Sequence, residues 1–372
     1  MKQKSLTFSV LLLLFLMCCP CTLFAQNTYK IGVTVPLSGP WAQWGTDLKN
    51  GLILSSNSTK NKFEFDLQDD LCAGRSGLSN VHKFTQIDKI TTIFAGCVEI
   101  MDAISPILDP KKHSLVALGG MEKRILQRNP SITSFSSLTD SEAYFLVPYL
   151  LDQTKIQSIA LVNGTNLFGE TLGASIATML KDSRIKLHSH HSIALETSDF
   201  KPIITKILQS PPDAIWVHQG DTAIGIFLKQ LYNAGYKGKI YSVFSLENLP
   251  LESAENPWLE GVIYTFPTEA TTKSAELQSF NKTYKAAYGN IPGATSKIAY
   301  DALQVLDQAI QKCSGMDNLC INKYFRALNA YEGLSGSVSL FSDGSAIRPF
   351  GLKAYKNGQF VTLVERLVPR TN

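Results

Sequence analysis

Short apolar segments alternate with amphipathic helical segments along most of this chain, and this alternation limits the folds that are open to it. In the first half, helical segments follow four apolar segments, KIGVTV, KFEFDLQDD, TTIFAG and HSLVALGG. The same plan returns in a second run, with SIALVN, DAIWVHQG and KIYSVFS. Because parallel strands are joined by long crossovers that are usually helices, the pattern predicts an α/β fold with doubly wound parallel sheets, covered by helices on both faces.

The length of the chain predicts two domains. Its 372 residues exceed the size at which a single hydrophobic core stops growing, which is roughly 250–300 residues. Past residue 268 the pattern becomes mainly helical, and three strands with turns at Asp343–Gly344 and Asn357–Gly358 close the chain.

The first 25 residues have the features of a secretory signal peptide. Lys2 and Lys4 precede the apolar run VLLLLFLM, and Ala25 suits a cleavage site. Since this run is short for a membrane span, we expect cleavage near Ala25 and export to an extracytoplasmic space, which the resemblance described below would make the periplasm. Three cysteines, Cys18, Cys19 and Cys21, leave open whether an N-terminal cysteine is lipidated.

The charge of the remaining chain excludes one class of partner. Without Lys2 and Lys4 it has 33 basic residues against 31 acidic ones. A nucleic-acid-binding protein needs a clear basic excess, so we expect no nucleic-acid partner.

Four cysteines remain beyond the leader, Cys72, Cys97, Cys313 and Cys320. An even number in an exported protein favours disulfides, and we expect Cys313 to pair with Cys320 and Cys72 with Cys97. A metal site is the competing interpretation, but the sequence has neither a C-x-x-C pair nor suitably spaced histidines.

The first strand ends at Pro36 and leads into a loop with Trp41 and Trp44. In parallel sheets ligands bind beyond the carboxyl ends of the strands, so this loop is a candidate ligand site. The two tryptophans are either a ligand platform or ordinary packing. The next helix, TDLKNGLIL, has Thr46 or Asp47 as its expected N-cap.

Four segments in this order resemble the periplasmic leucine/isoleucine/valine-binding proteins, which have the type I periplasmic binding fold. They are SGPWAQWG, QDDLC followed by AGC, ALVNGTNLFGE and IAYDALQVL. The resemblance implies two Rossmann-like lobes joined by three chain crossings, with the ligand between them. The first lobe would comprise residues 27–137 plus 269–345, and the second 138–268 plus 346–372.

The resemblance also implies a function. The protein would be a monomeric, extracytoplasmic solute-binding protein that passes a small polar ligand to the membrane permease of an ABC importer, without a cofactor. One alternative is a ligand sensor acting with a membrane receptor. An exported hydrolase is the other, but we find no nucleophile–base constellation and expect no enzymatic activity.

The resemblance places ten residues at the ligand site. Trp44 and Phe168 match aromatic residues that enclose the ligand in the family. The remaining eight occupy family positions with different side chains: Val98, Glu99, Gly120, Met121, Glu122, Gly220, Asp221 and Ser245.

These departures remove hydroxyl donors that a ligand carboxylate needs, so a branched-chain amino acid is disfavoured. Glu99, Glu122, Asp221 and Glu247 would together favour a cationic or hydroxyl-rich ligand. The alternative is that most of these carboxylates are solvated loop residues.

Three further features have ordinary structural interpretations. The histidines of HSHH, at positions 188, 190 and 191, fit a surface strand better than a metal site, because alternating side chains point to different faces. The resemblance implies that Asp69 and Asp70 are structural and close the end of a strand. Tyr300 either packs in the core or contacts ligand.

Overall fold

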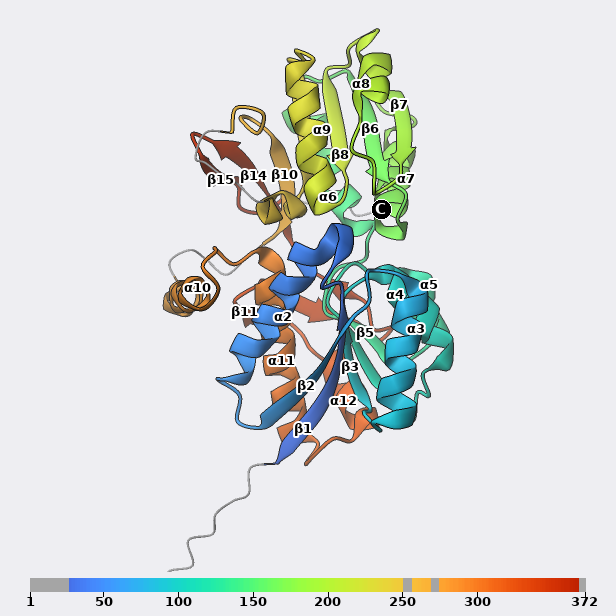
Figure 1. Ribbon diagram of the computed structural model, residues 1–372, viewed down its shortest axis with the longest axis vertical. Helices are drawn as coiled ribbons and strands as arrows, with labels where there is room; N and C mark the ends of the chain where they lie inside the picture. The colour runs from blue at the N-terminus through green and yellow to red at the C-terminus, as the bar shows by residue number, and fades with distance from the viewer. Residues whose placement is uncertain (1–26, 250–255, 269–273, 368–372) are drawn as a thin grey trace, which may run out of the picture.

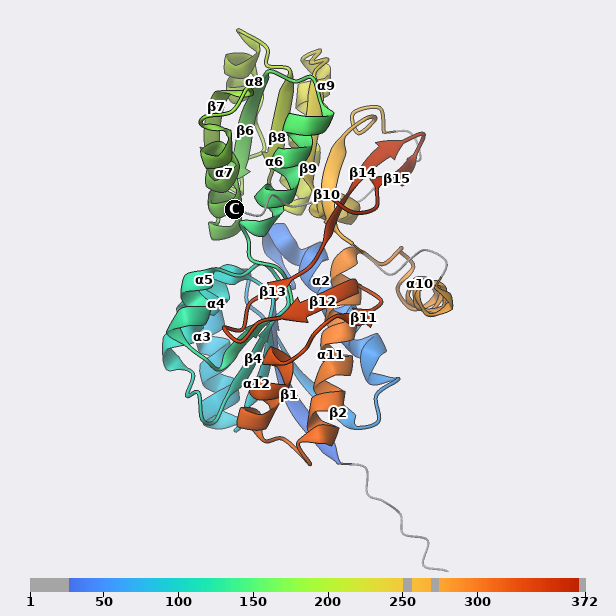
Figure 2. The ribbon, with the colours of Figure 1, turned by 180° about the vertical axis from the view of Figure 1, so that it is seen from behind.

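The computed structural model describes residues 27–249, 256–268 and 274–367, and it has two lobes, each built on its own sheet (Figures 1 and 2). The predicted signal peptide and its cysteines lie outside these residues. The first sheet has the order β2-β1-β3-β4-β5, and all its strands are parallel. Its strands are β1 (Thr28–Val35), β2 (Lys62–Asp69), β3 (Thr92–Ala95), β4 (Ser114–Ala117) and β5 (Ile132–Ser134).

The second sheet has seven strands in the order β15-β14-β10-β9-β8-β6-β7. Five of them are parallel, and the last two strands of the chain join the edge antiparallel. They are β6 (Ser158–Gly164), β7 (Lys186–Ile193), β8 (Ala214–His218), β9 (Lys239–Val243), β10 (Ile263–Pro267), β14 (Phe350–Lys356) and β15 (Gln359–Val364). The predicted Asn357–Gly358 turn joins β14 to β15, with both residues at positive φ.

Helices cover both faces of both sheets, as predicted. The first lobe has α2 (Ala42–Ser56), α3 (Gly74–His82), α4 (Val98–Ile104), α5 (Lys123–Arg128), α10 (Ala275–Tyr288), α11 (Ala294–Lys312) and α12 (Asn318–Arg326). The second lobe has α6 (Ser141–Gln153), α7 (Leu167–Leu180), α8 (Lys201–Leu208) and α9 (Asp221–Asn233). Among the described ranges, no helix is both long enough and apolar enough to cross a membrane.

The central strand β1 shows how sequence alternation builds the first core. Ile31, Val33 and Val35 are fully buried against α2 and α11 on one face. Gly32 points to the opposite face, where a Cβ atom would lie 2.6 Å from the ring of Phe84. Glycine at this position therefore lets Phe84 pack directly against the strand.

The chain crosses between the lobes three times: between β5 and α6, between β10 and α10, and between β13 (Ala346–Ile347) and β14. Strand β13 belongs to a small antiparallel sheet with β11 (Tyr331–Gly333) and β12 (Gly336–Leu340). The crossings bond to one another: Ser137 forms a bridge with Ala346, and the Thr268 N–H donates to Pro349 O at 2.9 Å. The predicted fold class, two doubly wound α/β lobes, is confirmed, while the residue boundaries of the lobes stay a prediction.

The predicted N-cap of the first helix is wrong. Helix α2 begins at Ala42, directly after a short 3₁₀ turn, so Thr46 and Asp47 lie inside it. Asp47 is buried and accepts hydrogen bonds from the hydroxyls of Tyr284 (2.7 Å) and Thr295 (2.5 Å) and from the Ser296 N–H (2.9 Å). Its carboxylate therefore caps α11 rather than its own helix.

Both predicted disulfides are present. Cys72 pairs with Cys97 across the ends of β2 and β3, with 5.5 Å between their Cα atoms. Cys313 pairs with Cys320 between α11 and α12, with 5.8 Å between their Cα atoms.

Candidate functional site

A cavity lies between the lobes, where the carboxyl ends of the two sheets face each other. Both sheets reverse their strand order beside their first strand, with the orders 2-1-3-4-5 and, for the second, β7-β6-β8-β9-β10. The loops at such switch points form ligand crevices in doubly wound folds. The cavity wall includes residues that follow β1, β3 and β4 in the first lobe and β6 and β9 in the second, together with His218 at the end of β8.

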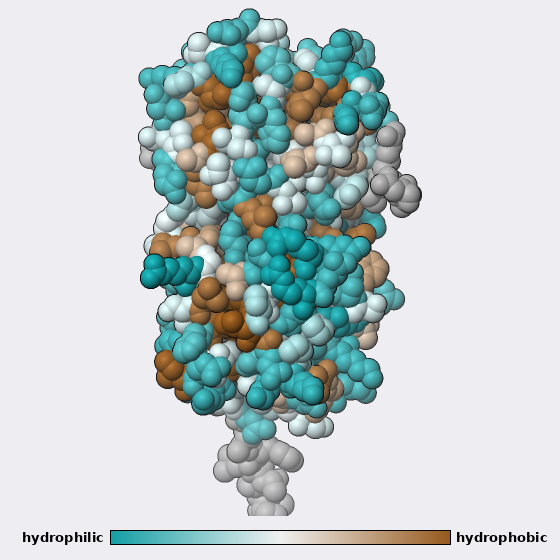
Figure 3. Space-filling view, turned by 90° about the vertical axis from the view of Figure 1, so that its right-hand side faces the viewer, coloured by the Kyte–Doolittle hydropathy of each residue, from teal (hydrophilic) through white to brown (hydrophobic). Residues whose placement is uncertain are grey.

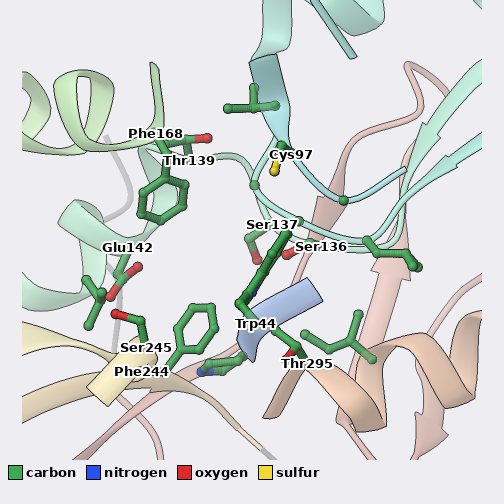
Figure 4. Close-up of a pocket in the computed structure, with 18 of the residues that line it drawn as sticks. Trp44, Cys97, Ser136, Ser137, Thr139, Glu142, Phe168, Phe244, Ser245 and Thr295 are labelled. Atoms are coloured by element: carbon green, nitrogen blue, oxygen red, sulfur yellow. The ribbon is translucent and has the colours of Figure 1, made fainter. Parts of the chain in front are cut away.

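Six of the ten predicted site residues line this cavity: Trp44, Val98, Glu99, Gly120, Phe168 and Ser245. In Figure 4, Trp44 stands on one side, and Phe168 and Ser245 lie across from it. The Trp44 ring packs close to Gly96 and Gly119, whose added Cβ atoms would lie 3.0 Å and 3.1 Å from it.

The other four predicted residues do not line the cavity. Met121 is fully buried in the core of the first lobe, and Glu122 is the residue before α5. Gly220 contacts the opposite lobe, since an added Cβ would lie 2.9 Å from Pro40. Asp221 is buried at the first position of α9, where it accepts a hydrogen bond from the Trp44 N–H at 3.2 Å.

The crossing segment between β5 and α6 contributes side chains that the sequence prediction missed. Ser136, Ser137 and Thr139 of this crossing line the cavity, as do Glu142 from the first turn of α6 and Thr295 from α11. The hydroxyls absent at the family positions Val98 and Gly120 are thus accompanied by hydroxyl side chains of the crossing elsewhere on the cavity wall. The run SFSSLTD, rich in hydroxyl side chains, was the available signal.

Aromatic rings from both lobes stack beside the cavity. The His218 ring lies 5.4 Å from Trp41 of the first lobe and 5.1 Å from Phe168, measured between ring centroids. Burial lowers the pKa of His218 to about 4, so this imidazole is neutral at physiological pH. His218 and Phe244 were also missed as wall residues by the sequence prediction, whereas Trp41, for which the sequence left a ligand platform or packing open, lines the cavity.

Two carboxylates, the partly buried Glu99 and the buried Asp221, connect the lobes through helix N-termini. Glu99, in the first turn of α4, accepts a hydrogen bond from the Leu167 N–H at the start of α7, at 2.8 Å. Asp221, at the start of α9, accepts a hydrogen bond from the Trp44 N–H in the first turn of α2. Burial raises the pKa of both groups, that of Asp221 to about 7. On the face shown in Figure 3, the surfaces of the two lobes are continuous.

The four acidic residues singled out from the sequence are not solvated loop carboxylates. Glu99 and Asp221 are bonded across the lobes, and burial raises the pKa of Glu122. Glu247 accepts hydrogen bonds from the Tyr264 hydroxyl at 2.7 Å and from the Lys353 ammonium at 2.8 Å. Only Glu99 of the four lines the cavity.

Several buried polar atoms on the cavity wall have no hydrogen-bond partner in the described part of the chain: Ser245 Oγ, His218 Nδ1 and Arg348 Nη2. Leaving such atoms unpaired costs about 1–3 kcal/mol each, which a polar ligand would recover. The volume of the cavity that the centres of water molecules can occupy is about 90 Å³. A single water needs roughly 10–15 Å³ by the same measure, so the cavity holds several. The site therefore suits a small molecule with polar ends and an apolar body.

The histidine-rich segment is an edge strand, β7, as predicted. His190 Nε2 lies 2.6 Å from Asn163 Oδ1. Within residues 27–249, 256–268 and 274–367, the one group with metal-ligand geometry is Asp70, Cys72 and Cys97, whose sulfurs already form the disulfide.

The remaining candidates also have structural roles. Asp69 accepts a hydrogen bond from the Leu37 N–H at 2.8 Å, and Asp70 accepts one from the Thr34 hydroxyl at 2.9 Å, so both close the end of β2 as predicted. Tyr300 packs edge-on against Phe280, away from the cavity wall.

Comparisons with known proteins agree with this architecture. The family model of the periplasmic binding protein matches residues 28–359. The leucine-, isoleucine-, valine-, threonine- and alanine-binding protein of Pseudomonas aeruginosa is 18% identical over 89% of this chain and 90% of its own. The leucine-specific-binding protein of Salmonella typhimurium is 22% identical over 89% and 90% of the two chains.

Solved structures share the fold. A leucine-binding protein from Thermotoga maritima superposes with a TM-score of 0.81, at 18% identity over 90% of this chain and 97% of its own. A solute-binding protein of an ABC transporter from R. palustris, in complex with benzoate, has a TM-score of 0.83 at 18% identity, over 92% and 98% of the two chains. With the family model matching nearly the whole described chain, this protein belongs to the periplasmic binding protein family.

Proposed function

We propose that the protein captures a small solute between its lobes in the periplasm and passes it to the membrane permease of an ABC importer. The observation that carries this proposal is the cavity itself, where aromatic rings and unpartnered buried polar atoms from both lobes meet at the two switch points. The relatives named as amino-acid-binding proteins, and the R. palustris protein with benzoate, support a solute of similar size. Trp44, Phe168 and Phe244 would enclose its apolar body, and the hydroxyls of the crossing would bind its polar ends.

A thermal-shift screen of the chain without residues 1–25 tests this function. The panel contains amino acids, short peptides, polyamines, amides, sugars and aromatic acids. A solute at 100 times its dissociation constant adds about 2.7 kcal/mol to the unfolding free energy, which raises the melting temperature measurably. Calorimetry would then confirm one site per chain.

A folded protein that binds nothing in this panel would count against solute capture. The sensor alternative makes a different prediction about the partner. An importer requires genes for a permease and an ATPase, whereas a sensor requires a membrane receptor that binds the protein with its ligand.

A further inference from the structure

Glu142 is a buried carboxylate that the fold leaves almost without donors. It lies in the first turn of α6, is 3% exposed and lines the cavity. Its one hydrogen bond to a described residue comes from the Thr265 hydroxyl on β10. That hydroxyl also lies 3.3 Å from Ser242 O, so its single proton has two acceptors.

No positive charge balances Glu142 in the described protein. Burial is the sole cause that raises its pKa well above the usual range, with no contribution from a neighbouring base. The cavity's guanidinium, Arg348, donates through Nε to Phe135 O (2.7 Å) and through Nη1 to Ser335 O (3.0 Å), while its Nη2 has no described partner and forms no bond to Glu142. An ionised carboxylate buried in this way is costly unless a cation pairs with it.

The neighbours of Glu142 suit a positively charged group. Ser245 Oγ is buried and without a partner, and Figure 4 shows it beside Glu142, with both side chains directed into the same space. The rings of Phe168 and Phe244 flank this space. A carboxylate, a hydroxyl acceptor and aromatic faces together match the binding needs of an ammonium group.

We propose that Glu142 binds a protonated amine of the solute and thereby selects for amine-bearing ligands. This inference rests on the proposed solute-binding function and defines its ligand class. A purely structural carboxylate would have a full set of donors, as Asp47 has. A ligand carboxylate placed here would meet a second acid without a balancing charge.

A proton balance follows from this assignment. In the empty cavity burial disfavours the ionised form of Glu142 and raises the pKa of its carboxyl group. When the ammonium group binds, the carboxylic acid ionises, pairs with the amine and gives its proton to solvent. At pH values below its raised pKa, binding therefore releases a proton from this residue.

The test uses two sets of three compounds with matched carbon skeletons. One set is L-leucine, 4-methylpentanoate, which lacks the amine, and 3-methylbutylamine, which lacks the carboxylate. The other is L-phenylalanine, 3-phenylpropanoate and 2-phenylethylamine. Calorimetry at pH 6, in two buffers with different ionisation enthalpies, gives both affinity and protons released. The variant is Glu142→Gln, and the matched control is Glu170→Gln, an exposed carboxylate of the same lobe.

We expect an amine-bearing member to bind at least about tenfold more tightly than its amine-free counterpart, with proton release. Glu142→Gln should remove this preference and the proton release while its melting temperature stays near that of the wild type, and Glu170→Gln should change neither. Equal binding of the amine-free acid, or unchanged amine preference in Glu142→Gln, would overturn the assignment but leave solute capture intact.

If no member of either set binds, the solute found in the panel screen is compared with its amine-free analogue, and a hit without an amine overturns the assignment. A panel without any hit removes the solute-capture function and this inference together.

Discussion

Two buried carboxylates, one at the contact between α2 and α11 and the other on the cavity wall, have opposite surroundings. Asp47 in the helix contact is 2% exposed, and Tyr284, Thr295, Ser296 and Gly293 donate to it. Glu142 is equally buried but has the shared Thr265 hydroxyl as its one described donor. The difference shows how a carboxylate that completes the fold can be distinguished from one left available for a ligand.

The largest expected effect comes from Asp47. In Asp47→Ala, four buried donors at the start of α11 and on α10 lose their acceptor, so we expect the free energy of unfolding to fall by about 3 kcal/mol or more. Urea denaturation followed by circular dichroism measures this change. Asp182→Ala, at an exposed carboxylate, is the matched control. A loss below about 1 kcal/mol in Asp47→Ala would show that these donors find other partners.

Glu142→Gln should behave in the opposite way in the ligand-free protein. Burial raises the pKa of Glu142 in the folded protein above its ordinary value of 4.5. Protonation of this group therefore stabilises the folded protein fully below pH 4.5, and this stabilisation is lost as the pH rises through the folded-state pKa. Glutamine cannot ionise, so the variant should be more stable than the wild type at pH 8 and closer to it at pH 4.5. Urea denaturation at the two pH values measures the difference. The same difference at both would contradict the account of an unbalanced buried acid.

Trp44→Ala tests the role of the indole ring on the cavity wall without removing the backbone contact of this residue with the other lobe. The Trp44 N–H that donates to Asp221 belongs to the backbone and is retained in the variant. We expect affinity for the solute found by screening to weaken by about 1 kcal/mol or more, with little change in fold. Calorimetry measures this, with Tyr232→Ala, at an exposed ring, as control. Unchanged affinity would remove the first loop from the binding site.

The smallest effect concerns closure of the lobes. The pKa of Asp221 is raised to about 7 by burial, with a further contribution from the nearby charge of Asp47. In an open form Asp221 would be solvated and keep a value near 3.8. The closed form therefore loses stability as pH rises from about 4 to 7. Small-angle scattering of the ligand-free protein should show a larger radius of gyration at pH 8 than at pH 5, and a smaller change in Asp221→Asn. An equal change in both proteins would assign the opening to other groups.

The sequence was sufficient for features that depend on local pattern or on compartment. Alternating apolar segments predicted the parallel sheets, since strand and helix periods are local properties. The expected export of the chain predicted that its cysteines form disulfides, and both predicted pairs are present. The loop after the first strand was identified as part of the site, because the carboxyl ends of parallel strands meet at one edge.

The site itself was only partly predictable. Six of the ten residues chosen by resemblance line the cavity, while Met121 and Gly220 are used for packing within and between lobes. The crossing segment with Ser136 and Ser137 was missed because it has no periodicity of its own, and Glu142, in the first turn of the helix that follows, was missed with it. Its side chains face the cavity only once both lobes have folded on either side of it.

Local sequence thus determined the strands, the helices and the covalent links of this protein. The tertiary structure decided which buried acids have partners, because the donors come from distant segments. Asp47 receives donors from residues 284–296, more than two hundred positions away, and no nearby sequence pattern indicates them. Glu142 meets Thr265 across the second sheet and otherwise faces the cavity. Whether such an acid serves the fold or a ligand is a property of these long-range contacts, and a linear pattern of residues does not contain them.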